Sequence, residues 1–316
     1  MIQVNVTTFI YNGTVEVTVQ TGQDLDFITL HAADMLSVQL ESVTRYATAS
    51  TETGTVIPSQ LFRYSPQDYV VVRFGTRQAA TGSDPDSSGR LVLKFSYQAN
   101  LVDGGLSGLY LSTYTDYKDS DDSVGVQNNI ASTQFEFYDA RKVFPCFDEP
   151  AFKTPFTITI IHDRSMNATF SNMDLISSES VNNDWIISRF RETPPMASYL
   201  VALLVSDFVC VNRVDNGVTY RVCAARMYQH KLDYALGLGP KVLQYLESLT
   251  DFKSPLNKVD MVAIPYFNYG AMENWGLITY RETGLLYSDQ DTTSATKFSI
   301  ASVIAHELAH FVSRIY

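Results

Sequence analysis

The sequence is poor in cysteine, in clusters of basic residues and in long apolar runs. Its 316 residues include only 3 cysteines, too few for the disulfide framework of a small secreted scaffold. The net charge is -11, with 23 basic against 34 acidic residues, and no run of Lys or Arg occurs. Nucleic acids bind basic surfaces, so we expect no nucleic-acid partner.

Membrane and export signals are also lacking in the chain as given. No stretch reaches the roughly 18 uninterrupted apolar residues of a membrane span. The start, Met1 to Thr8, lacks the basic and apolar regions of a signal peptide. We therefore expect no direct membrane insertion and no export signal in this chain.

The composition is that of a globular protein, with 45% apolar and 18% charged residues. At roughly 100–200 residues per domain, the length predicts two domains or one domain and part of another. The sequence shows no internal repeat, low-complexity tract or flexible linker.

Three sequons indicate an extracellular protein, because only secreted chains are glycosylated at such sites. They begin at Asn5, Asn12 and Asn167. A second sign is the dipeptide Asn216-Gly217, which favours a two-residue hairpin turn. This turn would place Cys210 opposite Cys223, either as a cross-strand disulfide or as two free thiols. A disulfide would favour an oxidising compartment.

The first two thirds of the chain are typical of an antiparallel β domain. Apolar and polar residues alternate in several runs rich in β-branched and aromatic side chains, which predicts strands with one solvated face. These runs are Thr14–Val19, Tyr69–Phe74, Leu91–Tyr97 and Phe156–Ile160. Turn-rich segments such as 82–89 separate them. We place this domain at residues 1–206.

The remainder, residues 207–316, has a mixed α and β pattern. Apolar residues at helical spacing predict an amphipathic helix over Leu232–Leu249, with Ala235, Leu238, Val242, Leu246 and Leu249 on its apolar face. Strands are predicted at Val259–Ile264 and Leu277–Tyr280. A final helix should begin near Ser294, where polar residues can cap it.

The final predicted helix carries the motif His306-Glu307-Leu308-Ala309-His310. Its two imidazoles are four residues apart and so project from one helix face, with the glutamate beside them. This H-E-x-x-H pattern is typical of a zinc site in which the histidines bind Zn²⁺ and the glutamate is the general base. Two solvated histidines on a surface helix would be the structural alternative.

A second motif, Gly270-Ala271-Met272-Glu273-Asn274, precedes the first. Together they resemble the aminopeptidase N (membrane alanyl aminopeptidase) family of gluzincin zinc metallopeptidases. Further landmarks resemble that family in order along the chain: Thr133–Glu136, Asp139–Arg141, Phe144–Pro150, Ser198–Phe208, Val262–Pro265 and Leu277–Thr283. The resemblance implies a saddle-shaped antiparallel β domain followed by an incomplete thermolysin-like α+β catalytic domain. It also implies a secreted or cell-surface location.

The resemblance further implies roles for individual residues. Glu273 and Glu136 would hold the free α-amino group of a peptide, and Gln134 would line the pocket for the first side chain. Carboxylates bind an ammonium group well, which would restrict cleavage to the amino-terminal residue. The backbone of Gly270, Ala271 and Met272 would run beside the peptide, and Asn274 belongs to the same substrate-binding loop.

The resemblance also implies elements that would fall beyond Tyr316. These are a third zinc ligand, which is a glutamate, and a tyrosine that stabilises the tetrahedral intermediate. We therefore expect weak or absent zinc binding and little or no peptidase activity from this chain alone. The leading hypothesis is an aminopeptidase whose sequence is incomplete. A catalytically dead truncated form that binds peptides or a partner is the alternative, and a fold relative without peptide function is the third.

Overall fold

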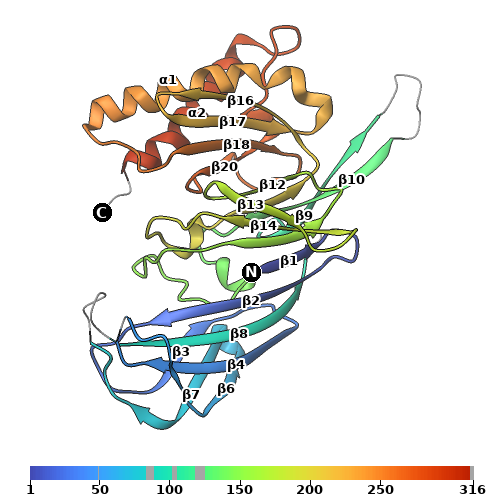
Figure 1. The fold of residues 1–316 in the computed structure, drawn as a ribbon. Helices are drawn as coiled ribbons and strands as arrows, with labels where there is room; N and C mark the ends of the chain where they lie inside the picture. The colour runs from blue at the N-terminus through green and yellow to red at the C-terminus, as the bar shows by residue number, and fades with distance from the viewer. Residues whose placement is uncertain (49, 83–88, 102–104, 118–124, 314–316) are drawn as a thin grey trace.

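The computed structural model describes all residues except 49, 83–88, 102–104, 118–124 and 314–316. The polypeptide forms β-sheets stacked on one another, with two α-helices covering the far side of the last sheet (Figure 1). The fold is thus mostly β, with an α+β region at its carboxyl-terminal side, and the predicted fold class is confirmed. No helix in the described ranges is both long and apolar enough to cross a membrane.

Within the described residues, the first part of the chain forms sheets of eight, four and three strands. In spatial order the eight-stranded sheet contains β13 (Leu175–Ser180), β14 (Trp185–Phe190), β11 (Thr159–Asp163), β1 (Ile2–Asn5), β2 (Ile10–Val19), β8 (Arg90–Asn100), β4 (Ser37–Tyr46) and β5 (Thr55–Val56). The four-stranded sheet contains β12 (Ala168–Ser171), β15 (Leu203–Ser206), β10 (Val126–Gln134) and β9 (Gly108–Asp116). The three-stranded sheet contains β3 (Leu25–His31), β7 (Tyr69–Gln78) and β6 (Ser59–Tyr64).

The predicted alternation accounts for the strands of these sheets. In β8, for example, every second side chain from Leu91 to Ala99 is buried, as the period of two in a strand requires. One predicted strand differs at its start, because β11 begins at Thr159 rather than at Phe156. Phe156 and Ile158 accept only single hydrogen bonds from the backbone of residues beyond β14 or at its end. One pair, β1 with β11, is parallel, which the local pattern did not predict.

The second part of the chain forms a five-stranded sheet in the described residues. Its order is β16 (Val209–Asp215), β17 (Val218–Ala224), β18 (Lys258–Ile264), β20 (Leu277–Arg281) and β19 (Ala271–Met272). Strand β18 is buried along its whole length and pairs in parallel with both neighbours, which explains why most of its residues are apolar. Short 3₁₀ helices connect elements throughout the chain: η1 (Ser65–Gln67), η2 (Ala140–Lys142), η3 (Ser198–Leu200), η4 (Arg226–Lys231) and η5 (Glu282–Gly284).

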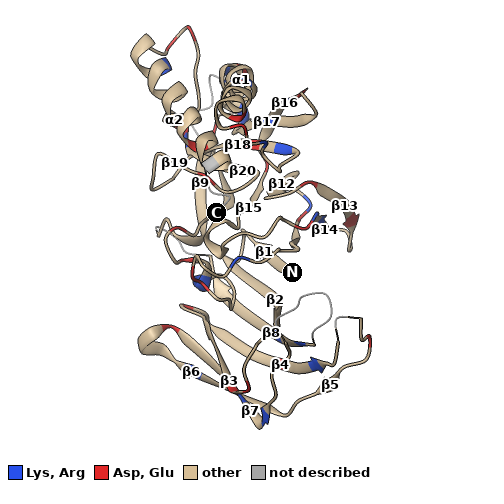
Figure 2. Ribbon diagram, turned by 90° about the vertical axis from the view of Figure 1, so that its left-hand side faces the viewer, with Lys and Arg blue, Asp and Glu red and all other residues tan. Residues whose placement is uncertain are grey.

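Helices α1 (Asp233–Thr250) and α2 (Ser294–Ser313) pack on each other and on this sheet, and α2 also contacts β19 (Figure 2). Helix α2 begins where predicted, and the Thr293 hydroxyl accepts a hydrogen bond from the Thr296 amide at 3.1 Å, which caps it. Lysines and arginines are dispersed among acidic residues over the ribbon in Figure 2.

The predicted apolar face of α1 is confirmed at Ala235, Leu238, Val242 and Leu246, which are buried or packed against the core, but not at Leu249, which is 66% exposed. The fully buried residues also include Gly239 and Leu243, which the apolar pattern did not single out. The reason is the close approach of α1 to β18: a Cβ atom on Gly239 would lie 2.8 Å from Met261 Cε. A residue without a side chain is therefore at the centre of the contact, and hydrophobicity alone did not locate it.

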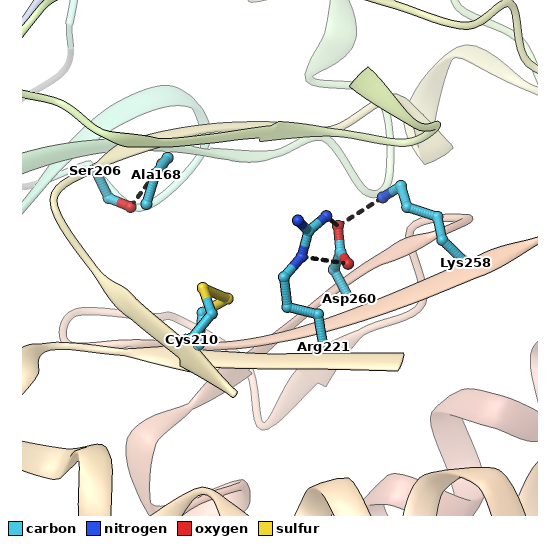
Figure 3. The surroundings of a disulfide bond; sticks show 7 residues. Ala168, Ser206, Cys210, Arg221, Lys258 and Asp260 are labelled. Atoms are coloured by element: carbon cyan, nitrogen blue, oxygen red, sulfur yellow. Dashed lines mark hydrogen bonds and ion pairs between the residues drawn. A yellow bond between two sulfur atoms is a disulfide. The ribbon is translucent and has the colours of Figure 1, made fainter. Parts of the chain in front are cut away.

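The β16–β17 hairpin has the predicted turn. Asn216 and Gly217 have φ values of 50° and 81°, as a type I′ turn requires. Cys210 and Cys223 are directly opposite each other and form a disulfide with a Cα–Cα distance of 4.2 Å (Figure 3). Cys146 is buried and has a free thiol.

Candidate active site

Helix α2 brings the two histidines of the motif together. His306 Nε2 and His310 Nε2 lie 3.2 Å apart, because residues four apart are one turn apart on a helix. The adjacent Glu307 is 4% exposed, and Ile304, Leu308 and Phe311 bury the inner side of the helix. Packing in the core therefore fixes the rotation of α2 and the direction of the imidazoles.

The loop that contains Glu273 lies against this helix. Strand β19 pairs antiparallel with β20, with Ala271 opposite Tyr280, and Glu273 follows at its end, 5% exposed. Glu273 Oε1 lies 3.9 Å from His310 Nδ1. Ligand atoms of Glu273, Glu307 and His310 all lie within 4.8 Å of one another. The two sequence motifs thus form one site.

The other residues of the loop differ in exposure. Gly270 is exposed, and its carbonyl accepts a hydrogen bond from the Arg281 amide at 2.9 Å. Ala271 is half-buried, whereas Met272 is buried. Asn274 is 1% exposed, and its side-chain amide donates to Thr279 Oγ1 at 3.3 Å. In the structure this amide therefore stabilises the turn between β19 and β20.

Gln134 is the last residue of β10, and Glu136 follows two positions later. Sequence alternation alone would place Glu136 on the solvated face of a strand, but β10 ends at Gln134 and Glu136 lies in the following turn, half-buried. Gln134 is 1% exposed. Among the described residues, neither atom of its side-chain amide has a hydrogen-bond partner, which is uncommon for a buried polar group and typical of a ligand site.

Like charges converge on Glu307. Burial first, and then the carboxylates of Glu273 and Glu136, raise the pKa of Glu307 to about 8. The buried Tyr280 lies in the same environment, where burial and Glu307 raise the pKa of its phenol. Sequence reasoning did not single out Tyr280, because a tyrosine in an apolar strand is typical of core packing. Three carboxylates crowded in this way favour a cationic ligand.

The two histidines fit a zinc ion. Nitrogen ligands about 2.0–2.1 Å from one tetrahedral zinc lie roughly 3.3 Å from each other, and the two Nε2 atoms are 3.2 Å apart. Imidazoles are common zinc ligands. The donor set and its spacing are thus compatible with the metal that the motif predicts.

The three sequons lie in different environments. Asn5 ends β1, and its side-chain oxygen accepts the Thr7 and Thr8 amides at 2.9 and 3.0 Å. Asn12 lies within β2 and accepts a hydrogen bond from Gln98. Asn167 is exposed in the turn before β12.

Comparison with known proteins agrees with this geometry. Residues 1–200 match the Peptidase M1 N-terminal domain, and residues 234–312 match the Peptidase family M1 domain. Glutamyl aminopeptidase of Bos taurus is 36% identical over 302 residues, which are 95% of this chain and 30% of that protein. Glutamyl aminopeptidase of Bitis rhinoceros is 39% identical over 262 residues, 82% of this chain and 26% of that protein.

Aminopeptidase N of Haemonchus contortus is 39% identical over 222 residues, which cover 70% of this chain and 22% of that protein. The chain therefore spans about a third or less of the length of these relatives. The match of the N-terminal domain alone covers well over half of the chain, and the second match contains both site motifs. The chain belongs to the M1 aminopeptidase family of metallopeptidases.

Proposed function

We propose that the protein containing this chain removes single amino-terminal residues from peptides, with His306 and His310 as zinc ligands. The observation that carries the proposal is the convergence of Glu273, Glu307 and His310 within 4.8 Å. We also propose a division into a β domain at residues 1–206 and part of a catalytic domain at residues 207–316. The start of the five-stranded sheet at Val209 supports this boundary.

Recognition of the free amino terminus is the role we propose for Glu273 and Glu136. Both carboxylates raise the pKa of Glu307, and Glu273 also lies 3.9 Å from His310. Their negative charge complements the α-ammonium group of a peptide. An ammonium group held beside the catalytic centre leaves room for one residue before the scissile bond. This restriction is what would make the protein an exopeptidase.

The rest of the peptide would lie along β19. This strand is at the edge of the five-stranded sheet in the described residues, and an extended peptide can add to such an edge through its main chain. The small residues Gly270 and Ala271 permit close approach of the two backbones. The amide of Gln134 would contact the first side chain, which supports a polar component in that pocket.

Glu307 is the general base in this proposal. Its Oε2 atom is buried and has no hydrogen-bond partner among the described residues, so it is placed to take a proton from the attacking water and return it to the leaving amine. Zinc, when bound, polarises the scissile carbonyl and makes water easier to deprotonate. For the base and the zinc to act on the same water, Glu307 and the two histidines must lie close together, and all three are on helix α2.

We also propose that the protein is extracellular and glycosylated. The disulfide between Cys210 and Cys223 supports an oxidising compartment. The exposed sequon at Asn167 leaves space for a glycan. Glycopeptide mapping of the secreted protein would detect a glycan there, and an unmodified Asn167 in protein recovered from the medium would contradict this part of the proposal.

The catalytic test is turnover of peptides by the zinc-loaded protein. Glu307→Gln should lower kcat by at least about 100-fold, while zinc stoichiometry stays at the wild-type value. Glu247→Gln, which changes a partly buried glutamate on α1, is the matched control and should retain activity. Wild-type turnover in Glu307→Gln would contradict its assignment as the base. Peptide affinity without turnover in the wild-type protein would favour a binding protein instead.

The recognition test compares one peptide with a free and with an acetylated amino terminus. Glu273→Gln should reduce the preference for the free peptide by about 10- to 100-fold, because a charge-assisted hydrogen bond contributes roughly 1.5–3 kcal/mol. The same preference in wild type and variant would refute amine binding by Glu273.

A further inference from the structure

The turn that follows Glu273 is bound to the β domain by two buried side chains. The carbonyl of Trp275 accepts a hydrogen bond from Asn172 Nδ2 at 2.8 Å, and the carbonyl of Gly276 accepts one from Lys258 Nζ at 2.7 Å. Both side chains act on backbone two or three residues beyond Glu273.

Asn172 directly follows β12 and is fully buried. Besides Trp275, its amide nitrogen donates to the Leu200 carbonyl at 2.7 Å, and its oxygen accepts from the Ala202 amide at 2.9 Å. The side chain is thus held within the β domain at both ends. Its remaining donor is directed across the junction to the loop.

Lys258 is the first residue of β18 and is 2% exposed. Its ammonium group donates to the Ser171 carbonyl at 2.8 Å and to Asp260 Oδ2 at 2.7 Å, in addition to Gly276. Arg221 holds both oxygens of Asp260 at 2.9 Å (Figure 3). An ammonium group has three donors, and all three are used here: one on Asp260, one on the Ser171 carbonyl in β12 and one on the Gly276 carbonyl in the turn before β20.

Gly276 makes the close approach possible. Its φ is 74°, and a Cβ atom there would lie 1.9 Å from the Asn172 carbonyl oxygen. The turn therefore packs directly against Asn172, which follows β12. Strand β12 belongs to the same four-stranded sheet as β10, and β10 ends at Gln134.

We propose that Asn172 and Lys258 are positioning residues that set the place of Glu273 relative to Gln134 and Glu136 across the junction of the two sheets. This inference rests on the proposed amine recognition by Glu273. The two proposed amine-binding carboxylates follow strands of different sheets, Glu273 after β19 and Glu136 after β10, so their separation depends on how these sheets are held together. Asn172, Lys258 and Gly276 hold the Glu273 loop directly on the sheet that carries the other two.

Three variants test the inference by different routes. Asn172→Ala and Lys258→Met each remove one hydrogen bond to the turn, and Gly276→Ala pushes the turn from Asn172 while keeping the Lys258–Asp260 ion pair. Each should reduce the preference for a free over an acetylated amino terminus by about tenfold. Hydrogen exchange at residues 270–277 should rise in the same variants.

The matched control is Ser206→Ala. The Ser206 hydroxyl is buried and donates to the Ala168 carbonyl at 2.9 Å, between β15 and β12 (Figure 3). Its loss weakens the same sheet without touching the turn. We expect a lower melting temperature but the wild-type preference and wild-type exchange at residues 270–277. A purely structural role of Asn172 and Lys258 would give this same result in all variants.

The outcomes separate the inference from the function on which it rests. If Glu273→Gln lowers the preference and Gly276→Ala and Asn172→Ala do not, the positioning role is wrong and amine recognition stands. If Glu273→Gln itself keeps the preference, amine recognition is wrong and the inference is overturned with it. Because Gly276→Ala leaves the buried charges paired, it decides the question even if Lys258→Met does not fold.

Discussion

Gln134 has a side-chain amide that is buried without a hydrogen-bond partner among the described residues. A buried polar group without a partner lowers the free energy of unfolding by roughly 1–3 kcal/mol. We therefore expect Gln134→Leu to increase the free energy of unfolding of the ligand-free protein by about 1 kcal/mol and to weaken peptide binding. Urea unfolding and peptide titration measure the two effects.

The neighbouring Thr133 provides the control for this prediction. It is equally buried, but its hydroxyl accepts a hydrogen bond from the Leu203 amide at 3.0 Å. Thr133→Val should therefore decrease the free energy of unfolding by roughly 1 kcal/mol. If Gln134→Leu were destabilising to the same extent, the amide would have a structural partner and not a ligand.

His162 gives the β domain a dependence on pH. Burial lowers the pKa of this imidazole below 6.5, although the backbone carbonyl of Asp163 and the Ser188 hydroxyl lie within hydrogen-bond distance. The unfolded chain thus binds the proton more readily, and stability present above pH 6.5 is lost as the pH falls through the folded pKa. Urea unfolding between pH 7 and pH 5 should show this loss, and His162→Gln should reduce it. An unchanged slope would assign the loss to other groups, such as His31, whose pKa burial also lowers.

At the level of single residues, the sequence located the histidines and Glu307 because their spacing on one helix is local. The sequence did not indicate that Asn172 and Lys258 are buried, because their neighbours along the chain show no pattern that predicts it. Lys258 is a charged residue at the start of a mostly apolar strand and has the pattern of a surface residue, but the structure buries it beside Asp260. Only the packing of two sheets turns that position into an interior one.

Among the elements, the β16–β17 hairpin is closed by the disulfide between Cys210 and Cys223. A loop of this size predicts a stabilisation of about 3 kcal/mol or less, since the hairpin also restricts the chain. Replacement of both cysteines by alanine should lower the free energy of unfolding by up to that amount and remove the effect of reductant. Cys146→Ala is the control and should keep the sensitivity to reductant, because Cys146 is a free thiol.

The elements also show where local patterns stop being informative. The hairpin and both helices were predicted, because turn residues, capping residues and helical periodicity act over a few positions. The face of α1 was predicted correctly except at Leu249, which is exposed, and the contact of Gly239 with Met261 was not predicted. The parallel pairing of β1 with β11 was not predicted either, because it joins distant segments.

For the whole molecule, zinc should couple to stability. A ligand that binds only the folded state adds about 2.7 kcal/mol at 100 times its dissociation constant. We expect the melting temperature of the metal-free protein to rise with the logarithm of the zinc concentration. His310→Ala should remove this effect, and an equal rise in the variant would place the metal elsewhere.

The sequence by itself determined the family, the β and α+β order of the chain, and the helix with two histidines and a glutamate, because each depends on short motifs and periodicities. The tertiary structure decided how these parts meet. It brought the loop of Glu273 onto α2, placed Glu136 in a turn where its charge raises the pKa of Glu307, and joined the turn after Glu273 to the residues at the end of β12 through Asn172 and Lys258. Such contacts join residues that are far apart along the chain, and their geometry follows from the packing of sheets, which no local pattern specifies.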